Sequence, residues 1–150
     1  VHEELFIEKY LTKEARKQYT KEQYTFYLGY LAHLLADKMW ASKIAYSAKM
    51  QMEDLFRENN AEFWRFVKRD WYDLDFRYLK KNPDFEAFQI YEKTVGFKNT
   101  FLDFFAEDAL EKRKEFITGF YHDGVEKVKE RETYISPKEL DIFVSDRIWT

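Results

Sequence analysis

Glycine and proline are scarce in this chain, with four glycines and two prolines among 150 residues. These residues interrupt helices more strongly than any others, so long helices are permitted. No stretch shows the alternation of Val, Ile or Thr with polar residues that is typical of strands, and no short repeat occurs. The sequence therefore predicts an all-α fold.

The apolar content is sufficient for one packed domain. Hydrophobic residues make up 45% of the chain and aromatic residues 20%, and each buried aromatic ring removes a large apolar area from water. The length is typical of one domain, and no linker-like composition interrupts it. We predict a single-domain bundle of about five to six helices over residues 1–150.

Local signals set the expected helix boundaries. Thr20 and Gln23 have the spacing of a capping box, in which two side chains satisfy free backbone N–H groups. Ser136-Pro137-Lys138-Glu139 is the stronger example, with proline at the first helical position. The predicted helices span residues 2–17, 21–57 with a bend, 61–80, 84–94 ending at Gly96, 99–131 with a break near Gly119 or Gly124, and 137–148.

The composition excludes several classes of site. No cysteine occurs, which rules out disulfides, thiol catalysis and cysteine zinc sites. No Gly-x-Ser-x-Gly, phosphate loop or dinucleotide fingerprint is present. The formal net charge is −3, and the basic clusters Lys80-Lys81 and Lys112-Arg113-Lys114 lie among acidic residues. Nucleic acid is therefore the least favoured partner.

The sequence contains no sign of a membrane or secretory segment. No apolar run reaches the roughly 18 residues of a membrane span, and no secretory signal is visible. We therefore expect a cytoplasmic protein without a membrane span. Because the chain begins at Val1 and not at Met, a trimmed or truncated piece is also expected, and the missing leader carries little weight.

The run YLGYLAHLLADKMW, residues 27–40, carries His33 and Asp37 four positions apart. On a helix these residues share one face, together with the aromatic Tyr30 and Trp40. One interpretation is a hydrogen-bonded pair buried in the core that fixes helix register. The other is a metal site, because imidazole and carboxylate groups of one helical turn can bind the same ion. Spacing alone favours the buried pair, since zinc needs at least three protein ligands.

Two other histidines are weaker candidates for metal ligands. His122 and Glu126 repeat the spacing of four, but Gly124 and Lys127 indicate an exposed stretch. His2 lies at a terminus that we expect to fray.

Asp70, Asp73 and Asp75 form a cluster of carboxylates in the predicted helix 61–80. Asp70 shares a stripe with core residues such as Phe63 and Val67, so we expect it to point inward. The simplest interpretation is charges interleaved with core aromatics on an amphipathic helix. The functional interpretation is that a carboxylate completes a metal site or acts as a base toward a metal-bound water.

The run at residues 27–40 resembles the helix that carries a His-x-x-x-Asp pair in the zinc-dependent phospholipase C-like family. Small bacterial members typically show LGYLTHLLTDxxW there, which residues 28–37 and Trp40 match. Residues 5–10, 73–79 and 134–143 show weaker similarity to flanking segments of those relatives. The resemblance implies an all-α fold, zinc and hydrolysis of phosphoester bonds, with His33 and Asp37 as metal ligands. It makes metal binding the favoured interpretation of the pair.

The chain departs from this family in its ligand set. Members carry further His and Asp ligands in an N-terminal segment, including a near-terminal His, a Pro-Asp and a Ser/Thr-His-Phe. This sequence has none of them, and His2 does not take the place of the family's His. We therefore expect either the C-terminal part of a longer hydrolase domain or a member with an inactive site.

Two functions remain as hypotheses. The first is a zinc-dependent phosphoester hydrolase in which His33 and Asp37 hold the metal and Asp75 orients the attacking water. Its substrate would be a small phosphoester or a phospholipid headgroup. The second is a non-catalytic helical interaction or structural domain with a buried His33–Asp37 pair, whose surplus aromatic residues serve a protein interface, including that of a homo-oligomer.

Overall fold

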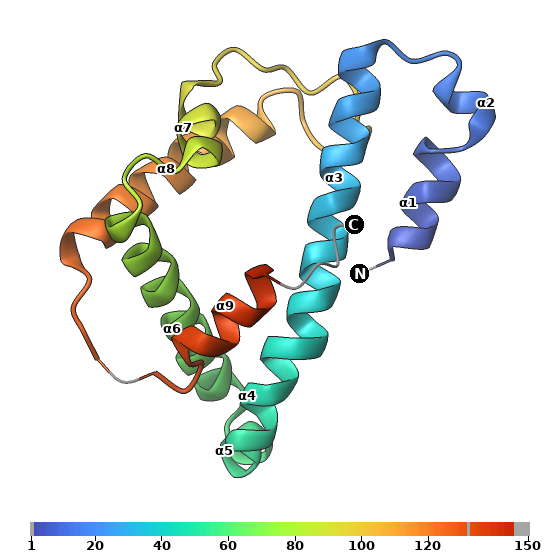
Figure 1. The fold of residues 1–150 in the computed structure, drawn as a ribbon. Coiled ribbons are helices and arrows are strands. Elements are labelled where there is room, and N and C mark those ends of the chain that lie inside the picture. The colour runs from blue at the N-terminus through green and yellow to red at the C-terminus, as the bar shows by residue number, and fades with distance from the viewer. Residues whose placement is uncertain (1, 132, 146–150) are drawn as a thin grey trace. The chain divides into compact units, whose positions relative to one another are not determined.

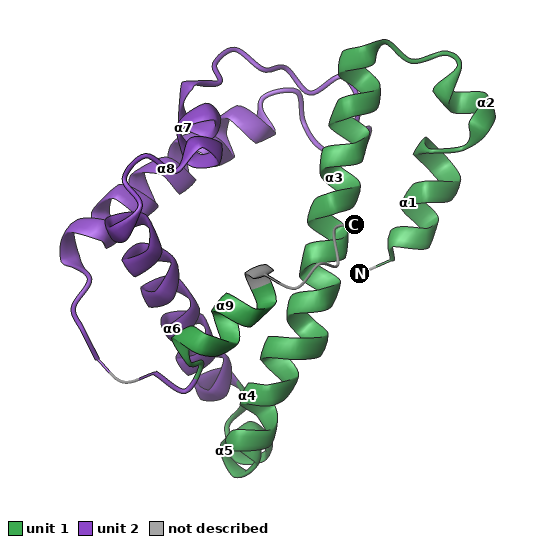
Figure 2. Ribbon diagram, in the orientation of Figure 1, with its two compact units in different colours: residues 1–60, 135–150 green, residues 61–134 purple. Residues whose placement is uncertain are grey.

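The computed structural model describes residues 2–131 and 133–145 (Figure 1). Over these residues the chain forms helices and no strands, which confirms the predicted all-α fold. None of the described helices combines the length and the apolar character that a membrane span requires. The chain divides into two compact units, which Figure 2 colours separately: residues 1–60 with 135–150, and residues 61–134. The single domain over residues 1–150 stays a prediction.

Unit 1 contains the N-terminal helices and the last helix. Its elements are α1 (Glu3–Tyr10), α2 (Lys13–Arg16), α3 (Lys21–Trp40), the π-helical turn η1 (Ala41–Ala45), α4 (Tyr46–Gln51), α5 (Glu53–Glu58) and α9 (Pro137–Ser145). Aromatic rings join α1 to α3. The ring centroid of Tyr10 lies 4.9 Å from those of Phe6 and Tyr27, and all three residues are buried.

The predicted helix over residues 2–17 is wrong as a continuous element. Helix α1 ends at Tyr10, and Thr12 starts α2 from an extended conformation. The Thr12 hydroxyl accepts a hydrogen bond from the Ala15 backbone N–H at 3.2 Å. The cause is a cap, because a side chain that satisfies the first free N–H groups begins a new helix.

The cap predicted at Thr20 is half confirmed. Its hydroxyl accepts from the Gln23 backbone N–H at 3.1 Å, but the Gln23 side chain donates to the Tyr27 hydroxyl at 3.3 Å. The predicted bend in 21–57 is confirmed. The helix passes through the π-helical turn η1 and is interrupted again at Met52, which has φ −126° and ψ 41°.

The capping box at the start of α9 is complete. The Ser136 hydroxyl accepts from the Glu139 N–H at 3.1 Å, and the Glu139 carboxylate accepts from the Ser136 N–H at 2.9 Å. The Ser47 hydroxyl also donates to Glu139 at 2.9 Å, which ties α9 to α4. The predicted end of this helix near residue 148 lies outside the described residues.

Unit 2 is built from α6 (Asn60–Lys81), α7 (Glu86–Lys93) and α8 (Ala109–Lys127). Helix α6 agrees with the predicted 61–80, and α7 falls within the predicted 84–94. Beyond α7, Gly96 has φ 71°, a left-handed conformation that glycine adopts without strain. Phe76 of α6 packs between two residues of α8, with ring centroids 5.3 Å from Phe120 and 5.6 Å from Tyr121.

The predicted helix over residues 99–131 is wrong in its first ten residues. They form an irregular loop around the buried Asn99, whose side chain accepts from the Leu102 N–H at 3.0 Å. The same side chain donates to the carbonyls of Leu102 and Phe105 at 2.7 and 2.8 Å. These bonds occupy backbone groups that a helix would need. Gly119 and Gly124 lie inside α8 and do not break it.

Candidate functional site

The predicted metal ligands lie one turn apart on α3. His33 Nε2 is 3.6 Å from Asp37 Oδ2, so the structure brings the pair together as the spacing predicts. The side chains are 61% and 48% exposed, so the prediction of a pair buried in the core is wrong. The cause is the direction of the buried face. Tyr27 is the buried residue of α3, and His33, six positions later, points about 120° away from it around the helix.

The 3.6 Å separation is too long for a hydrogen bond. Zinc binds imidazole nitrogen and carboxylate oxygen at about 2.0–2.2 Å in a tetrahedron, which places two ligand atoms about 3.4 Å apart. The two side chains therefore have the separation of two ligands of one ion. Tyr30 lies one turn earlier, and its ring centroid is 5.9 Å from that of the imidazole, with 65° between the ring planes. Burial and the nearby charge of Asp37 raise the pKa of Tyr30, so it stays a neutral neighbour of the pair.

The described residues supply fewer donors than a zinc site requires. Across residues 2–131 and 133–145, no group of three or more His, Cys, Asp or Glu side chains is arranged to hold a metal ion. His2 is exposed at the start of α1. His122 is exposed on α8 and pairs with Glu92 of α7, not with Glu126, as expected for a surface histidine. Two donors on one helical turn fit zinc in type and spacing but not in number.

No protein-family model, curated protein or solved structure matches this chain. The all-helical fold agrees with the resemblance drawn from residues 27–40, and the family itself stays a prediction.

Asp75, the predicted catalytic carboxylate, lies on α6 in unit 2. The Tyr121 hydroxyl of α8 donates to its carboxylate at 2.9 Å. Burial raises the pKa of Asp75 to about 6, against the smaller opposite effect of this hydrogen bond. Burial and the same carboxylate raise the pKa of Tyr121 well above its usual range. A carboxyl group with a pKa near 6 suits proton transfer near neutral pH, and the catalytic role of Asp75 stays a prediction.

Asp70 points inward, as its position in the sequence predicts, and it is fully buried. Arg131 Nη2 lies 2.7 Å from Asp70 Oδ1, and the Tyr134 backbone N–H donates to Asp70 Oδ2 at 2.6 Å. Arg131 also binds Asp73. Burial acts against the charge of Arg131, but its hydrogen bonds to the two carboxylates keep its pKa above the usual value. Asp70 and Asp73 therefore hold the segment after α8 against α6.

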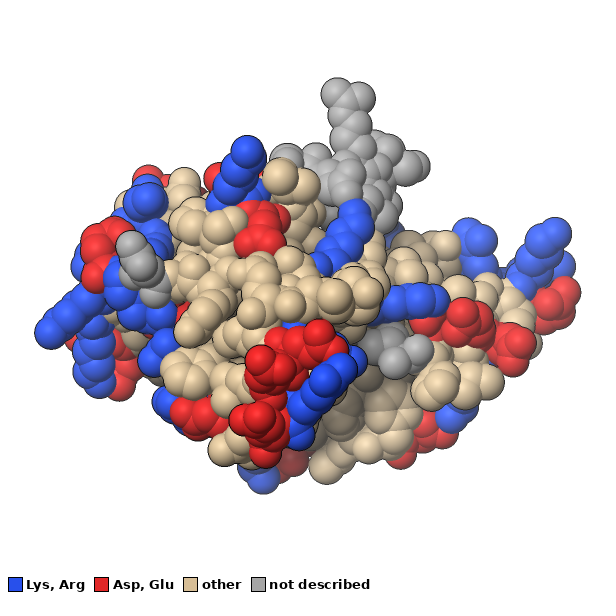
Figure 3. All heavy atoms as spheres, turned by 90° about the horizontal axis from the view of Figure 1, so that it is seen from below, with Lys and Arg blue, Asp and Glu red and all other residues tan. Residues whose placement is uncertain are grey.

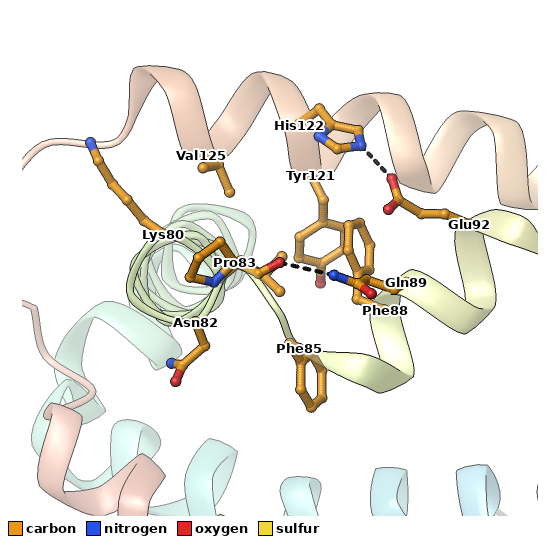
Figure 4. Close-up of a pocket in the computed structure, with 11 residues that line it drawn as sticks. Lys80, Asn82, Pro83, Phe85, Phe88, Gln89, Glu92, Tyr121, His122 and Val125 are labelled. Atoms are coloured by element: carbon orange, nitrogen blue, oxygen red, sulfur yellow. Dashed lines mark hydrogen bonds and ion pairs between the residues drawn. The ribbon is translucent and has the colours of Figure 1, made fainter.

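A pocket of 280 Å³ in unit 2 was not predicted from the sequence (Figure 4). It is formed by the end of α6 together with α7 and α8, so no local sequence motif could predict it. Phe85, Phe88 and Tyr121 provide its aromatic surface. Four of its lining residues bind each other in pairs: His122 pairs with Glu92, and the Gln89 side chain donates to the Pro83 carbonyl at 3.4 Å.

Proposed function

We propose that this chain is part of a zinc-dependent phosphoester hydrolase of the phospholipase C-like kind, in which His33 and Asp37 are two of the metal ligands. The observation that carries the proposal is the pair itself. Its donor atoms are 3.6 Å apart on the open side of α3, where an ion and a substrate have access to them. The similarity of residues 27–40 to the family's ligand helix supports the same assignment. The remaining ligands would come from outside the described residues.

Each residue of the pair has a distinct task in this proposal. His33 would bind through Nε2 as a neutral imidazole, and Asp37 would contribute a negative charge beside it. The Tyr30 ring lies beside the imidazole, and a regular helical turn holds both ligands on a rigid element. Zinc, when bound, lowers the pKa of a water molecule and neutralises charge on a phosphoester. A small phosphoester or a phospholipid headgroup is the proposed substrate.

An interaction domain is the second candidate. Several large apolar side chains of unit 1 are exposed, among them Leu5, Tyr46, Met50 and Ile142. Exposed apolar side chains favour a protein interface when they form a continuous patch. This candidate no longer includes a buried His33–Asp37 pair.

Zinc titration of the three histidines tests the metal site. The chain contains only His2, His33 and His122, so their imidazole resonances can be assigned by substitution. We expect Zn²⁺ to shift the His33 signal at a lower concentration than the other two. Asp37→Ala should bring the response of His33 to that of an isolated surface histidine.

His122→Ala is the matched control, because it removes an exposed histidine that also has a carboxylate neighbour. It should leave the zinc response of His33 unchanged. Elemental analysis of tag-free protein, with His33→Ala and Asp37→Ala beside it, gives the bound stoichiometry. If all three histidines respond alike and Asp37→Ala changes nothing, the hydrolase proposal is wrong and the interaction domain is favoured.

A further inference from the structure

Charged side chains of both signs occur on the protein surface. Over the face drawn in Figure 3, acidic and basic side chains are interleaved, in agreement with the small net charge of −3. One pocket of unit 2 differs from this pattern. It has a volume of 110 Å³ and lies between the last turns of α6 and the segment after α8. We call it the basic pocket; its lining residues are Arg77, Lys80, Lys81, Val128, Lys129 and Glu130.

We propose that the basic pocket binds the phosphate group of a small phosphate-bearing molecule. Four of its six lining residues are cations and one is an acid, which gives the lining a formal charge of +3. The end of α6 opposes an anion through its helix dipole, but this amounts to only about half a charge. The cations therefore determine the sign of the potential in the pocket.

Arg77 is the fixed part of this pocket. Its side chain is 12% exposed, and its Nη2 group donates to the carbonyls of Lys129 and Arg131 at 3.1 and 3.0 Å. These neutral acceptors orient the guanidinium without cancelling its charge. The Nε–H group is buried without a hydrogen-bond partner among the described residues. The carboxylate of Glu130 is 3.7 Å from Nη1, and that side chain is 86% exposed. Arg77 is thus held in place and keeps its charge.

The lysines surround this fixed guanidinium. Lys80, Lys81 and Lys129 are exposed. Figure 4 shows the Lys80 ammonium pointing away from the aromatic residues of the larger pocket. Lysines in the last turn of a helix interact favourably with its dipole, so Lys80 and Lys81 also have a structural role in stabilising the end of α6. This explanation does not cover Lys129, which lies beyond the end of α8.

The volume of the basic pocket limits the size of the group that it can bind. A cavity of about 150 Å³ binds benzene, so a pocket of 110 Å³ fits a group of about five heavy atoms, such as a phosphate. A fixed guanidinium beside flexible ammonium groups is a common way to bind phosphate oxygens. The shared chemistry is a phosphate group, whether it belongs to a soluble ester or to a lipid headgroup.

Titration with inorganic phosphate tests the proposal. The ¹⁵N-labelled chain is titrated in EDTA, so that metal binding at α3 does not contribute, with chloride at equal ionic strength as the reference. We expect saturable shifts of the Arg77 Nε–H signal and of the Lys129 and Glu130 amides. The double variant Lys81→Gln, Lys129→Gln should bind at least about tenfold more weakly, because each charge-assisted hydrogen bond contributes about that factor.

The matched control is the double variant Lys68→Gln, Lys112→Gln. It removes the same charge from exposed positions of α6 and α8 outside the basic pocket, and it should keep the parent's affinity. No saturable response beyond that to chloride, or equal weakening in both double variants, would overturn the proposal.

Two further probes identify the source of the phosphate. Binding of glycerol phosphate without retention on vesicles assigns a soluble ester. Retention on phosphatidylcholine vesicles that contain phosphatidic acid, lost in the Lys81→Gln, Lys129→Gln variant, assigns a lipid headgroup. Either result supports the pocket. Saturable binding of a single-stranded oligonucleotide with no response to inorganic phosphate contradicts it.

Discussion

The ring of Phe76 lies where a side chain at position 124 would begin. A Cβ built on Gly124 falls well inside van der Waals contact distance of three atoms of that ring. The close approach of α6 and α8 at this point is possible because Gly124 has no side chain. The aromatic contacts of Phe76 with Phe120 and Tyr121 depend on that approach.

Gly124→Ala should lower the free energy of unfolding by about 1–3 kcal/mol, because the added methyl group forces Phe76 or the helices apart. Gly119→Ala is the matched control, since nothing lies within 4 Å of a Cβ there. That change should stabilise the chain by up to about 1 kcal/mol through helix propensity. Urea unfolding of the three proteins measures both effects, and equal stabilities for the two variants would contradict the close approach.

The raised pKa of Asp75 makes stability depend on pH. The folded protein holds the proton up to about pH 6, whereas the unfolded chain loses it near the ordinary value of 3.8. Between these values the folded state binds more protons, so this group's contribution to stability falls as the pH rises from about 4 to 7. The loss is on the order of 1–3 kcal/mol.

Asp75→Asn removes this titration and keeps an acceptor for the Tyr121 hydroxyl. We expect the stability of the variant relative to the parent to increase from pH 4 to pH 7. Every other carboxylate contributes to both proteins and cancels in the difference. Chemical denaturation at several pH values measures the difference in the free energy of unfolding between the variant and the parent. A difference that does not change with pH would show that the pKa of Asp75 is not raised.

Breaking the ion pair of Asp70 and Arg131 should cost more stability than breaking an exposed pair. Asp70 has only 1% of its side chain exposed, so Arg131→Met leaves a buried carboxylate whose nearest cation is Arg69, with Nε at 3.9 Å, and should cost about 2–4 kcal/mol. Arg65→Met removes the exposed partner of Glu62 and should cost much less, because an exposed ion pair contributes little to stability. Thermal unfolding compares the loss of stability in the two variants. Similar losses would argue against a buried charge at Asp70.

Ser136→Ala should destabilise the start of α9 by about 1 kcal/mol, because it removes the acceptor for the Glu139 N–H. Ser42→Ala is the control. Its exposed hydroxyl donates to the Met39 carbonyl within a helical stretch, where alanine is the better residue. Hydrogen exchange at Glu139 reports the cap directly, and unchanged protection there would show that the box is not formed in solution.

Features set by neighbouring residues could be predicted from the sequence. The capping box at Ser136 depends on positions three apart, and the inward direction of Asp70 follows from the stripe of apolar residues around it. The break at Thr12 was also local, but the apolar pattern of residues 2–17 concealed it. The loop at 99–108 has charged and aromatic residues at helical spacing, and only the bonds of the Asn99 side chain show why it is not a helix.

Features that join distant parts of the chain could not be predicted in the same way. The partner of Asp70 is Arg131, on a different element, and no pattern near either residue identifies the other. The exposure of His33 and Asp37 depends on which side of α3 meets α1, and Phe6 and Tyr10 decide this by packing on Tyr27. Whether further donors join this pair also depends on the assembled protein and not on one helical turn.

The π-helical turn at Ala41–Ala45 shifts the phase of the helical stretch that follows α3. Such a turn takes one residue more than an α-helical turn, so each later side chain points about 100° away from the direction that an unbroken helix would give it. Ile44 and Ala45 at the end of the turn and Ala48 after it are buried, and Ser47 reaches Glu139 of α9. Deleting one residue of the turn would restore a regular α-helix and leave these residues facing their partners, because it removes the extra residue that the turn takes up. The π-helical turn therefore determines how the buried side chains after it are directed relative to His33 and Asp37 before it.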